Sequence, residues 1–364
     1  MNKLIQLILI IILTQTSLIA QGLSFKNVEA FKNPKAIGAH LDSLVALKQF
    51  SGTAYVSKGE EVILQKAYGY ANINDEVPNL IDTKFNIGSI NKIFTKVCVM
   101  QLVDKGKISL NDKIVKYIPE LKMEMADEIT IEHLYKMSSG FGDYLDSEKY
   151  QKTYRSFSNM EDYLSIISEL KLGFKPGTSM QYSNAGYELL GIMIQRVSGQ
   201  NYYDYVRKNI YDKANMKNSG SFKRDGTTEN LAYAYSQFKP GETFGKPKES
   251  TKNIVFYNAD DRLPLRGSAA GGGYSTAMDF LKFSKALNQN KFMSNKATEL
   301  FHSLSRGFPG SKTLMGAGGS YGISAMMYFN YTKDFAVIVL SNLDPPAATN
   351  IGAKIIKSLE FGTF

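Results

Sequence analysis

Apolar residues recur at strand spacing near both ends of the chain. Two such runs, residues 52–56 and 62–70, flank the turn-forming sequence Ser57-Lys58-Gly59-Glu60 and predict a β-hairpin. Two more runs, 322–329 and 335–340, predict a second pair of strands close to the C-terminal end. More than half of the chain separates the two pairs, so they form one sheet only if the chain returns on itself.

The intervening sequence is dominated by apolar residues three or four positions apart, which is the spacing of a helix face. The stretch 129–169 is mixed and mainly helical, whereas 219–266 is polar and irregular, as is typical of long surface loops. Well-defined helices are expected at residues 34–48, 89–105, 185–197 and 202–214, from Thr276 onward, and at 347–359. Helices are therefore expected between the two pairs of strands.

This order of elements predicts an α+β fold of the sandwich type. One antiparallel sheet would be built from the N- and C-terminal segments and flanked by the terminal helices, with a helical subdomain inserted between them. The sheet part would span about residues 21–80 and 255–364, and the helical part about residues 81–254. A cleft between two such parts is a natural place for a functional site.

Residues 1–20 have the pattern of a secretory signal peptide. Lys3 is their only charged residue, the apolar run 4–13 follows, and the small residue Ala20 marks the expected cleavage point. Residues 21–364 would then form the mature protein, exported to the periplasm or secreted. The alternative is an uncleaved membrane anchor, for which the apolar run is short. No later stretch is long and apolar enough to predict a membrane span.

Composition and charge narrow the possible functions. The net charge is +9, but the basic residues are scattered and no nucleic-acid-binding motif is present, so nucleic acid is not an expected partner. The three histidines, His40, His133 and His302, lack the spacing of metal ligands, so no metal site is predicted. The single cysteine, Cys98, cannot form an internal disulfide, and its apolar surroundings favour a small buried side chain over a nucleophilic thiol.

One candidate for chemistry is the tetrad Ser89-Ile90-Asn91-Lys92, where a loop is expected to turn into a helix. Residues three apart share one helix face, so the Lys92 amine can lie beside the Ser89 hydroxyl. A serine hydroxyl is a weak nucleophile at neutral pH and needs a base, and a desolvated lysine can serve as that base. The first helical turn also offers unpaired backbone N–H groups. Ser-x-x-Lys is common by chance, so the tetrad alone predicts little.

A second candidate is the stretch 176–184, Pro-Gly-Thr-Ser-Met-Gln-Tyr-Ser-Asn, just before an expected helix. Taken alone, it would be a Pro-Gly turn followed by an Asn helix cap, with Tyr182 as a packing aromatic. Its Tyr182-Ser183-Asn184 sequence gains meaning only together with the Ser-x-x-Lys tetrad.

The two motifs, in this order, resemble the serine β-lactamase and penicillin-binding-protein superfamily. The likeness is greatest to its class C-like branch of esterases, D-amino-acid peptidases and β-lactamase-related hydrolases. The resemblance implies a serine acyl hydrolase that needs no cofactor or metal and acts on small-molecule or peptide-like esters and amides, β-lactams and D-amino-acid derivatives among them. It covers most of the chain after residue 20 and rests on ordered matches at 67–72, 85–92, 102–112, 129–134, 138–140, 176–184, 186–187, 190–191, 197–199, 271–276 and 339–345.

The resemblance also implies a role for each matched residue. Ser89 would be the acylated nucleophile and would contribute its backbone N–H to the oxyanion hole. Lys92 would hold or accept the Ser89 proton. Tyr182 would shuttle that proton to the leaving group and help to activate water, and Asn184 would orient Lys92 and bind substrate.

The third motif of the family, Lys-Thr-Gly or His-x-Gly on an edge strand, is incomplete. The equivalent stretch reads Met-Gly-Ala-Gly-Gly-Ser-Tyr-Gly at 315–322, and we assign Ala317 to the position of the Lys or His. By resemblance, Gly318 and Gly319 would contact substrate, and the N–H of Ser320 would complete the oxyanion hole. Loss of one charge-assisted hydrogen bond, worth about 1.5–3 kcal/mol, should weaken the enzyme most on substrates that carry a carboxylate.

Two other interpretations stay open. One is a binding or envelope-remodelling protein that kept the fold and lost turnover, which the change at Ala317 would explain. The other is a Ser-His-Asp hydrolase that uses His133 or His302, although no Gly-x-Ser-x-Gly sequence surrounds Ser89.

Overall fold

The sheet expected from the two ends of the chain is present in the computed structural model, which describes residues 31, 33–225, 227–242, 244, 254–305 and 312–361. It has five antiparallel strands in the order β2-β1-β11-β10-β9. β1 (Gly52–Lys58) and β2 (Glu61–Tyr68) form the N-terminal hairpin, and β1 also pairs with β11 (Phe335–Ser341). β10 (Ile323–Asn330) then joins β11 to the edge strand β9 (Thr313–Ser320).

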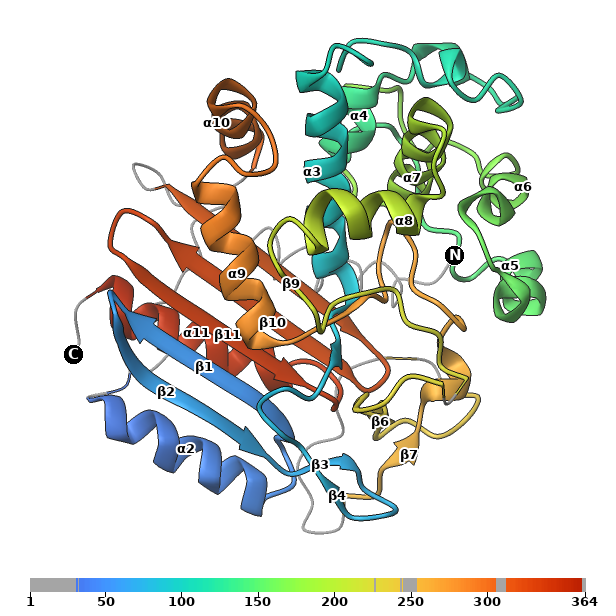
Figure 1. Cartoon of the computed structure of the whole chain (residues 1–364). Helices are drawn as coiled ribbons and strands as arrows, with labels where there is room; N and C mark the ends of the chain where they lie inside the picture. The colour runs from blue at the N-terminus through green and yellow to red at the C-terminus, as the bar shows by residue number, and fades with distance from the viewer. Residues whose placement is uncertain are drawn as a thin grey trace.

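Helices cover both faces of this sheet (Figure 1). One face packs against α2 (Pro34–Ala46) and α11 (Ala347–Glu360), and the other packs against α9 (Ala277–Asn288). Successive strand residues point to opposite faces, so Met326 joins the core under α2 and α11 while Met327 joins the core on the other side. Because both faces are covered, β10 and β11 are buried along their whole length.

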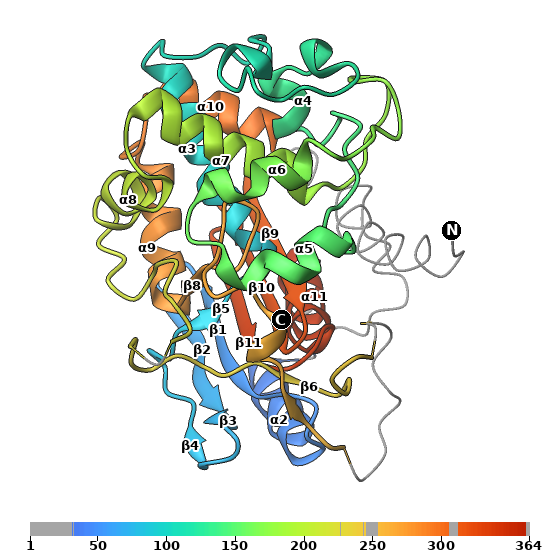
Figure 2. The ribbon, with the colours of Figure 1, turned by 90° about the vertical axis from the view of Figure 1, so that its right-hand side faces the viewer.

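The helical part lies against the α9 side of the sheet (Figure 2). Its central helix, α3 (Asn91–Asp104), follows the short 3-10 turn η2 (Gly88–Ile90) and is buried along most of its length. α7 (Asn184–Ser198) packs on α3 and on α4 (Ile131–Tyr135), and α8 (Tyr202–Val206) packs on α3 and α7. The η2 turn contacts β9, so the start of α3 is held at the edge of the sheet.

The remaining elements are short, and one pair of them bears on the site. β5 (Phe85–Asn86) pairs with β8 (Tyr274–Ser275), which brings the residues just before η2 beside the start of α9. The other short elements are β3 (Tyr70–Asn72), β4 (Val77–Pro78), α5 (Glu148–Thr153), α6 (Leu164–Ile167), β6 (Tyr235–Ser236), β7 (Tyr257–Asn258) and α10 (Asn295–Leu304).

The structure confirms the α+β fold and differs from expectation in two helices. The helix expected at 202–214 is only partly α-helical, because α8 ends at Val206 and continues directly as a π-helical turn, Arg207–Tyr211. α10 was not expected, because its sequence is mostly polar and its buried apolar residues are only Ala297 and Phe301. The boundaries given above for the sheet part and the helical part stay a prediction.

The N-terminal leader expected at 1–20 lies outside the described residues. Among the residues that are described, none of the helices is both long and apolar enough to cross a membrane.

Candidate active site

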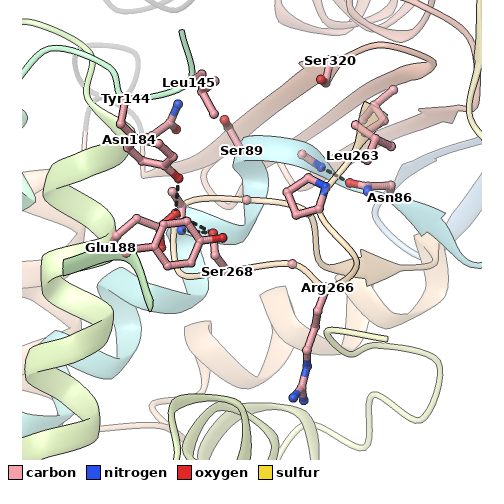
Figure 3. Close-up of a pocket in the computed structure, with 18 of the residues that line it drawn as sticks. Asn86, Ser89, Tyr144, Leu145, Asn184, Glu188, Leu263, Arg266, Ser268 and Ser320 are labelled. Atoms are coloured by element: carbon pink, nitrogen blue, oxygen red, sulfur yellow. Dashed lines mark hydrogen bonds between the residues drawn. The ribbon is translucent and has the colours of Figure 1, made fainter. Parts of the chain in front are cut away.

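Ser89 lies in η2, where the chain leaving β5 enters α3 (Figure 3). The turn is tight: Gly88 has a positive φ of 49°, and its N–H donates to the Asn86 side-chain oxygen at 2.9 Å. A Cβ atom on Gly88 would lie 2.9 Å from the backbone nitrogen of Gly319, so glycine is needed for β9 to come this close. The Ser89 hydroxyl is thereby held where the helix meets the edge of the sheet.

The Lys92 amine lies one turn along α3 and is surrounded by four oxygen atoms. Its Nζ is 3.1 Å from Ser89 Oγ and 2.6 Å from the Tyr182 hydroxyl. It also donates to Asn184 Oδ1 at 2.7 Å and to the Ala270 carbonyl at 2.5 Å, and the residue is only 4% exposed. The two carbonyl oxygens thus hold the amine between the hydroxyl groups of Ser89 and Tyr182.

Tyr182 reaches the site from the loop before α7. Its hydroxyl contacts both Ser89 Oγ and Lys92 Nζ, and its ring centre lies 4.7 Å from the Lys92 nitrogen. The N–H of the preceding residue, Gln181, donates to the Met137 carbonyl at 2.9 Å and holds the loop in place. Three groups that can exchange protons, a hydroxyl, a phenol and an amine, are thus in mutual contact.

Asn184 is the first residue of α7, and its amide is oriented from both sides. Its Nδ2 donates to Asp143 Oδ2 at 2.7 Å, which turns its Oδ1 toward Lys92. Ser183 caps the helix, because its Oγ accepts from the Gly186 N–H at 3.1 Å. The structure therefore brings the predicted Asn184 into contact with the predicted Lys92.

The edge strand β9 lies beside Ser89, but the structure corrects the assignment of Ala317. A Cβ atom on Gly318 would lie 2.8 Å from Ser89 N, and one on Gly316 would contact the first residues of α3, so both positions face the site side of the sheet. Alternation turns Ala317 to the opposite face, where its cross-strand partner Met326 packs under α11. Gly316, which has the His-x-Gly spacing to Gly318, is the residue on the site face, so glycine and not Ala317 stands in the place of the Lys or His.

A second correction concerns the backbone N–H groups of β9. Ser320 pairs with Ile323 across a two-residue turn, and a pair this close must exchange its own backbone hydrogen bonds. The Ser320 N–H therefore points into the sheet toward β10. The next N–H along the strand, that of Gly319, points to the free edge beside η2. Gly319, and not Ser320, thus presents its N–H next to Ser89.

A pocket of about 120 Å³ lies against Ser89 (Figure 3). Its lining combines the edge of β9, the start of α3, one side of α7 and the loop before β8. The lining residues include Ser89, Tyr144, Tyr150, Tyr163, Asn184, Glu188, Arg224, Arg266, Ser268, Gly319 and Ser320.

Glu188 is the pocket residue that sequence reasoning missed. It lies on α7 one turn after Asn184, is fully buried, and its Oε1 accepts from the Tyr144 hydroxyl at 2.7 Å and from Ser268 Oγ at 2.6 Å. Burial raises the pKa of Glu188 to about 7, against the opposing effect of these two hydrogen bonds. A lone acid inside the otherwise buried helix stretch 185–194 was the available signal in the sequence.

The other candidate nucleophiles and bases lie elsewhere. His133 helps to cap α4, because the Thr130 N–H donates to its Nδ1 at 3.3 Å. His302 lies on α10, and burial lowers its pKa to about 4. Cys98 is fully buried, which raises the pKa of its thiol. None of these three residues lines the pocket, and the described part of the chain contains no cluster of three His, Cys, Asp or Glu residues that could hold a metal ion.

Comparison with known sequences gives a family and several relatives. The profile of the Beta-lactamase family matches residues 38–358. The chain is similar to Penicillin-binding protein 4* of Bacillus subtilis (strain 168), with 27% identity over 258 residues, which is 69% of this chain and 55% of that protein. It is also similar to Protein flp of Staphylococcus aureus (strain MRSA252), with 29% identity over 53% of this chain and 39% of that protein. The chain thus spans about half or less of the length of these two relatives.

Solved structures agree with this assignment. A penicillin binding protein from Bacillus halodurans superposes with a TM-score of 0.75 and 26% identity over 87% of this chain and 98% of that one. The D-amino acid amidase from Ochrobactrum anthropi SV3 has a TM-score of 0.72 and 21% identity over 91% and 100% of the two chains, which shows a shared fold. Because the family match runs from α2 into α11 and includes both the sheet and the helical part, the chain belongs to the Beta-lactamase family of hydrolases.

Proposed function

We propose that this chain is a serine acyl hydrolase that forms an acyl-enzyme at Ser89 and cleaves ester, amide or peptide-like bonds. The observation that carries the proposal is the mutual contact of the Ser89 hydroxyl, the Tyr182 phenol and the Lys92 amine. A buried amine costs folding free energy, and such groups gather at functional sites more often than elsewhere. Family membership supports the same chemistry.

In the proposed acylation, the Ser89 oxygen attacks the substrate carbonyl carbon while its proton passes to Lys92, directly or through Tyr182. The C–O or C–N bond of the substrate then breaks, the leaving group takes a proton from Tyr182, and Lys92 passes the proton from Ser89 back to Tyr182. In deacylation, water attacks the acyl carbon and gives a proton to the same pair of groups. Ser89 recovers its proton as the acid product leaves, so every group returns to its starting state.

The backbone N–H groups of Ser89 and Gly319 are the proposed donors to the carbonyl oxygen. The first N–H groups of a helix have no intrahelical acceptor, and that of Gly319 lies on a free sheet edge, so both are available. One donor of this kind contributes about 100- to 1,000-fold to the rate. The proposed role of Gly318 is to allow the strand to approach, because a Cβ atom there would collide with the Ile87 carbonyl.

A non-catalytic binding protein is the alternative, and one observation favours it. Gly316 leaves the site face of β9 without the cationic side chain that the third motif would provide. A protein that lost this group would retain the pocket and lose much of its turnover on substrates that carry a carboxylate.

Intact mass separates the two functions. Wild-type protein, Ser89→Ala and the control Ser320→Ala would be incubated with a fluorophosphonate and, separately, with a penicillin. We expect one adduct on wild type and on Ser320→Ala, and none on Ser89→Ala. Folded wild-type protein that takes up neither reagent would favour the binding protein. Export is part of the same proposal, and a mature protein whose mass corresponds to a start at Gln21 would support it.

A further inference from the structure

A buried carboxyl, that of Glu188, lies close to the proposed base and has no part in the mechanism above. Glu188 is one turn after Asn184 on α7, and Asn184 Oδ1 accepts from Lys92 Nζ at 2.7 Å. Figure 3 shows the side chains of Glu188 and Asn184 on the same side of α7. Glu188 is fully buried, so it has no contact with a substrate and can act on the reaction only through its neighbours.

The loop before β8 joins Glu188 to Lys92. Glu188 Oε1 accepts from Ser268 Oγ at 2.6 Å, and that oxygen in turn accepts from the Ala270 N–H at 3.3 Å. On its other side, the loop offers three consecutive carbonyl groups to side chains of α3. The pairs are Asn91 with Ser268, Thr95 with Ala269 and Lys92 with Ala270. Glu188 therefore holds, from α7, the same segment whose carbonyl group holds Lys92.

Glu188 and Lys92 also act on each other through their charges. Burial raises the pKa of Glu188 to about 7, and the hydrogen bonds from Ser268 and Tyr144 and the positive charge of Lys92 oppose this increase. An electrostatic interaction is mutual, so the Glu188 anion favours the ammonium form of Lys92. The Oε2 atom of Glu188 has no hydrogen-bond partner among the described residues, so no hydrogen bond there offsets the charge.

We propose that Glu188 is the buried counterion of Lys92, a positioning residue that stabilises the ammonium group formed when Lys92 takes the proton of Ser89. Through Ser268 it also fixes the Ala270 carbonyl that holds the amine. Glu188 keeps its charge during the reaction, so the protons move as described above and no further bond changes. A fixed charge stabilises a developing opposite charge more strongly in a buried site than in water. This inference rests on the proposed hydrolase function.

Tyrosines are the other titratable groups packed around Glu188. They come from α5, α8 and the segments that precede α5 and α6, and burial raises the pKa of each of them. They therefore stay neutral in neutral solution and do not take over the role of the anion. These residues are Tyr144, Tyr150, Tyr163, Tyr202 and Tyr203.

Lys92 has a second carboxyl nearby, that of Asp143, which differs from Glu188 in its surroundings. Asp143 is exposed to solvent, and its oxygens accept from Asn184 Nδ2 and from two backbone N–H groups. Water and these donors weaken its effect on Lys92, whereas the charge of Glu188 is buried. The phenols that face Lys92 are those of Tyr182 and Tyr187.

The dependence of kcat/KM on pH, measured with p-nitrophenyl acetate, tests the counterion. The acidic limb of this profile reports the free enzyme's base. Glu188→Gln keeps an acceptor oxygen and loses the charge. We expect its acidic limb to move to lower pH by about one unit, and its rate at high pH to fall by up to about 10-fold. Glu169→Gln, the same change at an exposed residue outside the pocket, should match wild type. A limb that stays in place in Glu188→Gln, or that moves only in Asp143→Asn, would overturn the proposal.

A measurement without turnover separates a failure of this inference from a failure of the proposed function. The free energy of unfolding would be followed against pH for four proteins: wild type, Glu188→Gln, Lys92→Met and the double variant. The difference that Glu188→Gln makes reports the titration of Glu188. This titration should lie at higher pH in the Lys92→Met background, because the anion there lacks its neighbouring charge. An unchanged titration overturns the counterion, even where esters are cleaved. If wild type cleaves no ester but the titration moves, the hydrolase proposal falls and the buried ion pair stands.

Discussion

The Nζ atom of Lys92 lies 3.1 Å from the Oγ atom of Ser89, one turn away on the same helical segment. The contact depends on where the helix begins, because Gly88 turns the chain just before Ser89 and α3 continues without a break through Lys92. The amine is also held from outside the helix by the Ala270 carbonyl, so it has little freedom to leave the serine.

Replacing Lys92 by alanine should remove the proposed base. We expect acylation to slow by about 100- to 10,000-fold, the range for loss of general-base catalysis. The Asn184 and Ala270 oxygens would lose a donor, at a cost of about 1–3 kcal/mol, which the fold should survive. Rates of fluorophosphonate labelling measure the effect. Lys96→Ala, one turn further along α3, is the control, and a Lys92→Ala enzyme that labels at the wild-type rate would rule out this base.

Tyr182→Phe should separate the hydroxyl from the ring. The phenyl group can still lie over the Lys92 amine, but no proton can pass from position 182 to a leaving group. We expect kcat for esters with poor leaving groups to fall by about 100-fold or more, and esters with good leaving groups to be affected less, because they need less protonation. A comparison of alkyl and p-nitrophenyl esters measures this. Equal losses on both kinds of ester would argue against a role in leaving-group protonation.

The two faces of β9 predict different effects for histidine at neighbouring positions. Gly316→His would place the imidazole on the site side, where the Ile93 side chain has to shift, whereas Ala317→His would place it under α11. We expect Gly316→His to raise kcat/KM for carboxylate-bearing esters relative to neutral esters, by up to about 10-fold. Ala317→His should leave that ratio unchanged. An altered ratio in Ala317→His alone would show that our assignment of the faces is wrong.

The fold was predictable because its signals are local. The strands at both ends and the helix at 185–197 each show apolar spacing within a single element, and the structure has α7 at Asn184–Ser198. α10 was missed although Ala297, Leu300, Phe301 and Leu304 have the spacing of a helix face, because this stripe covers only two turns and the other residues of the helix are polar.

The site was predictable only in part, for a related reason. Ser89 and Lys92 share one helix, so their spacing is visible in the sequence. The glycine-rich β9 carries no side-chain alternation that would show which residue faces the site, and a shift of one residue exchanges the faces, so Ala317 was assigned in place of Gly316. Glu188 was missed because its partners, Tyr144 and Ser268, are 44 and 80 residues away.

Glu188 should also give the protein a distinctive dependence of stability on pH. Its pKa is about 7 in the folded protein, against the ordinary value of 4.5 for a glutamate in an unfolded chain. Between these two values the folded state keeps a proton that the unfolded state has lost. The contribution of Glu188 is therefore fully present below about pH 4.5 and is lost as the pH rises through 7, for a total of about 3 kcal/mol.

The variant Glu188→Gln tests this contribution, because its amide side chain cannot titrate. The free energy of unfolding of the variant minus that of wild type, from urea titrations across this range, should rise with pH by this amount. Subtraction cancels the histidines and the other carboxyls, and a difference that stays flat would mean that Glu188 titrates normally in the folded protein.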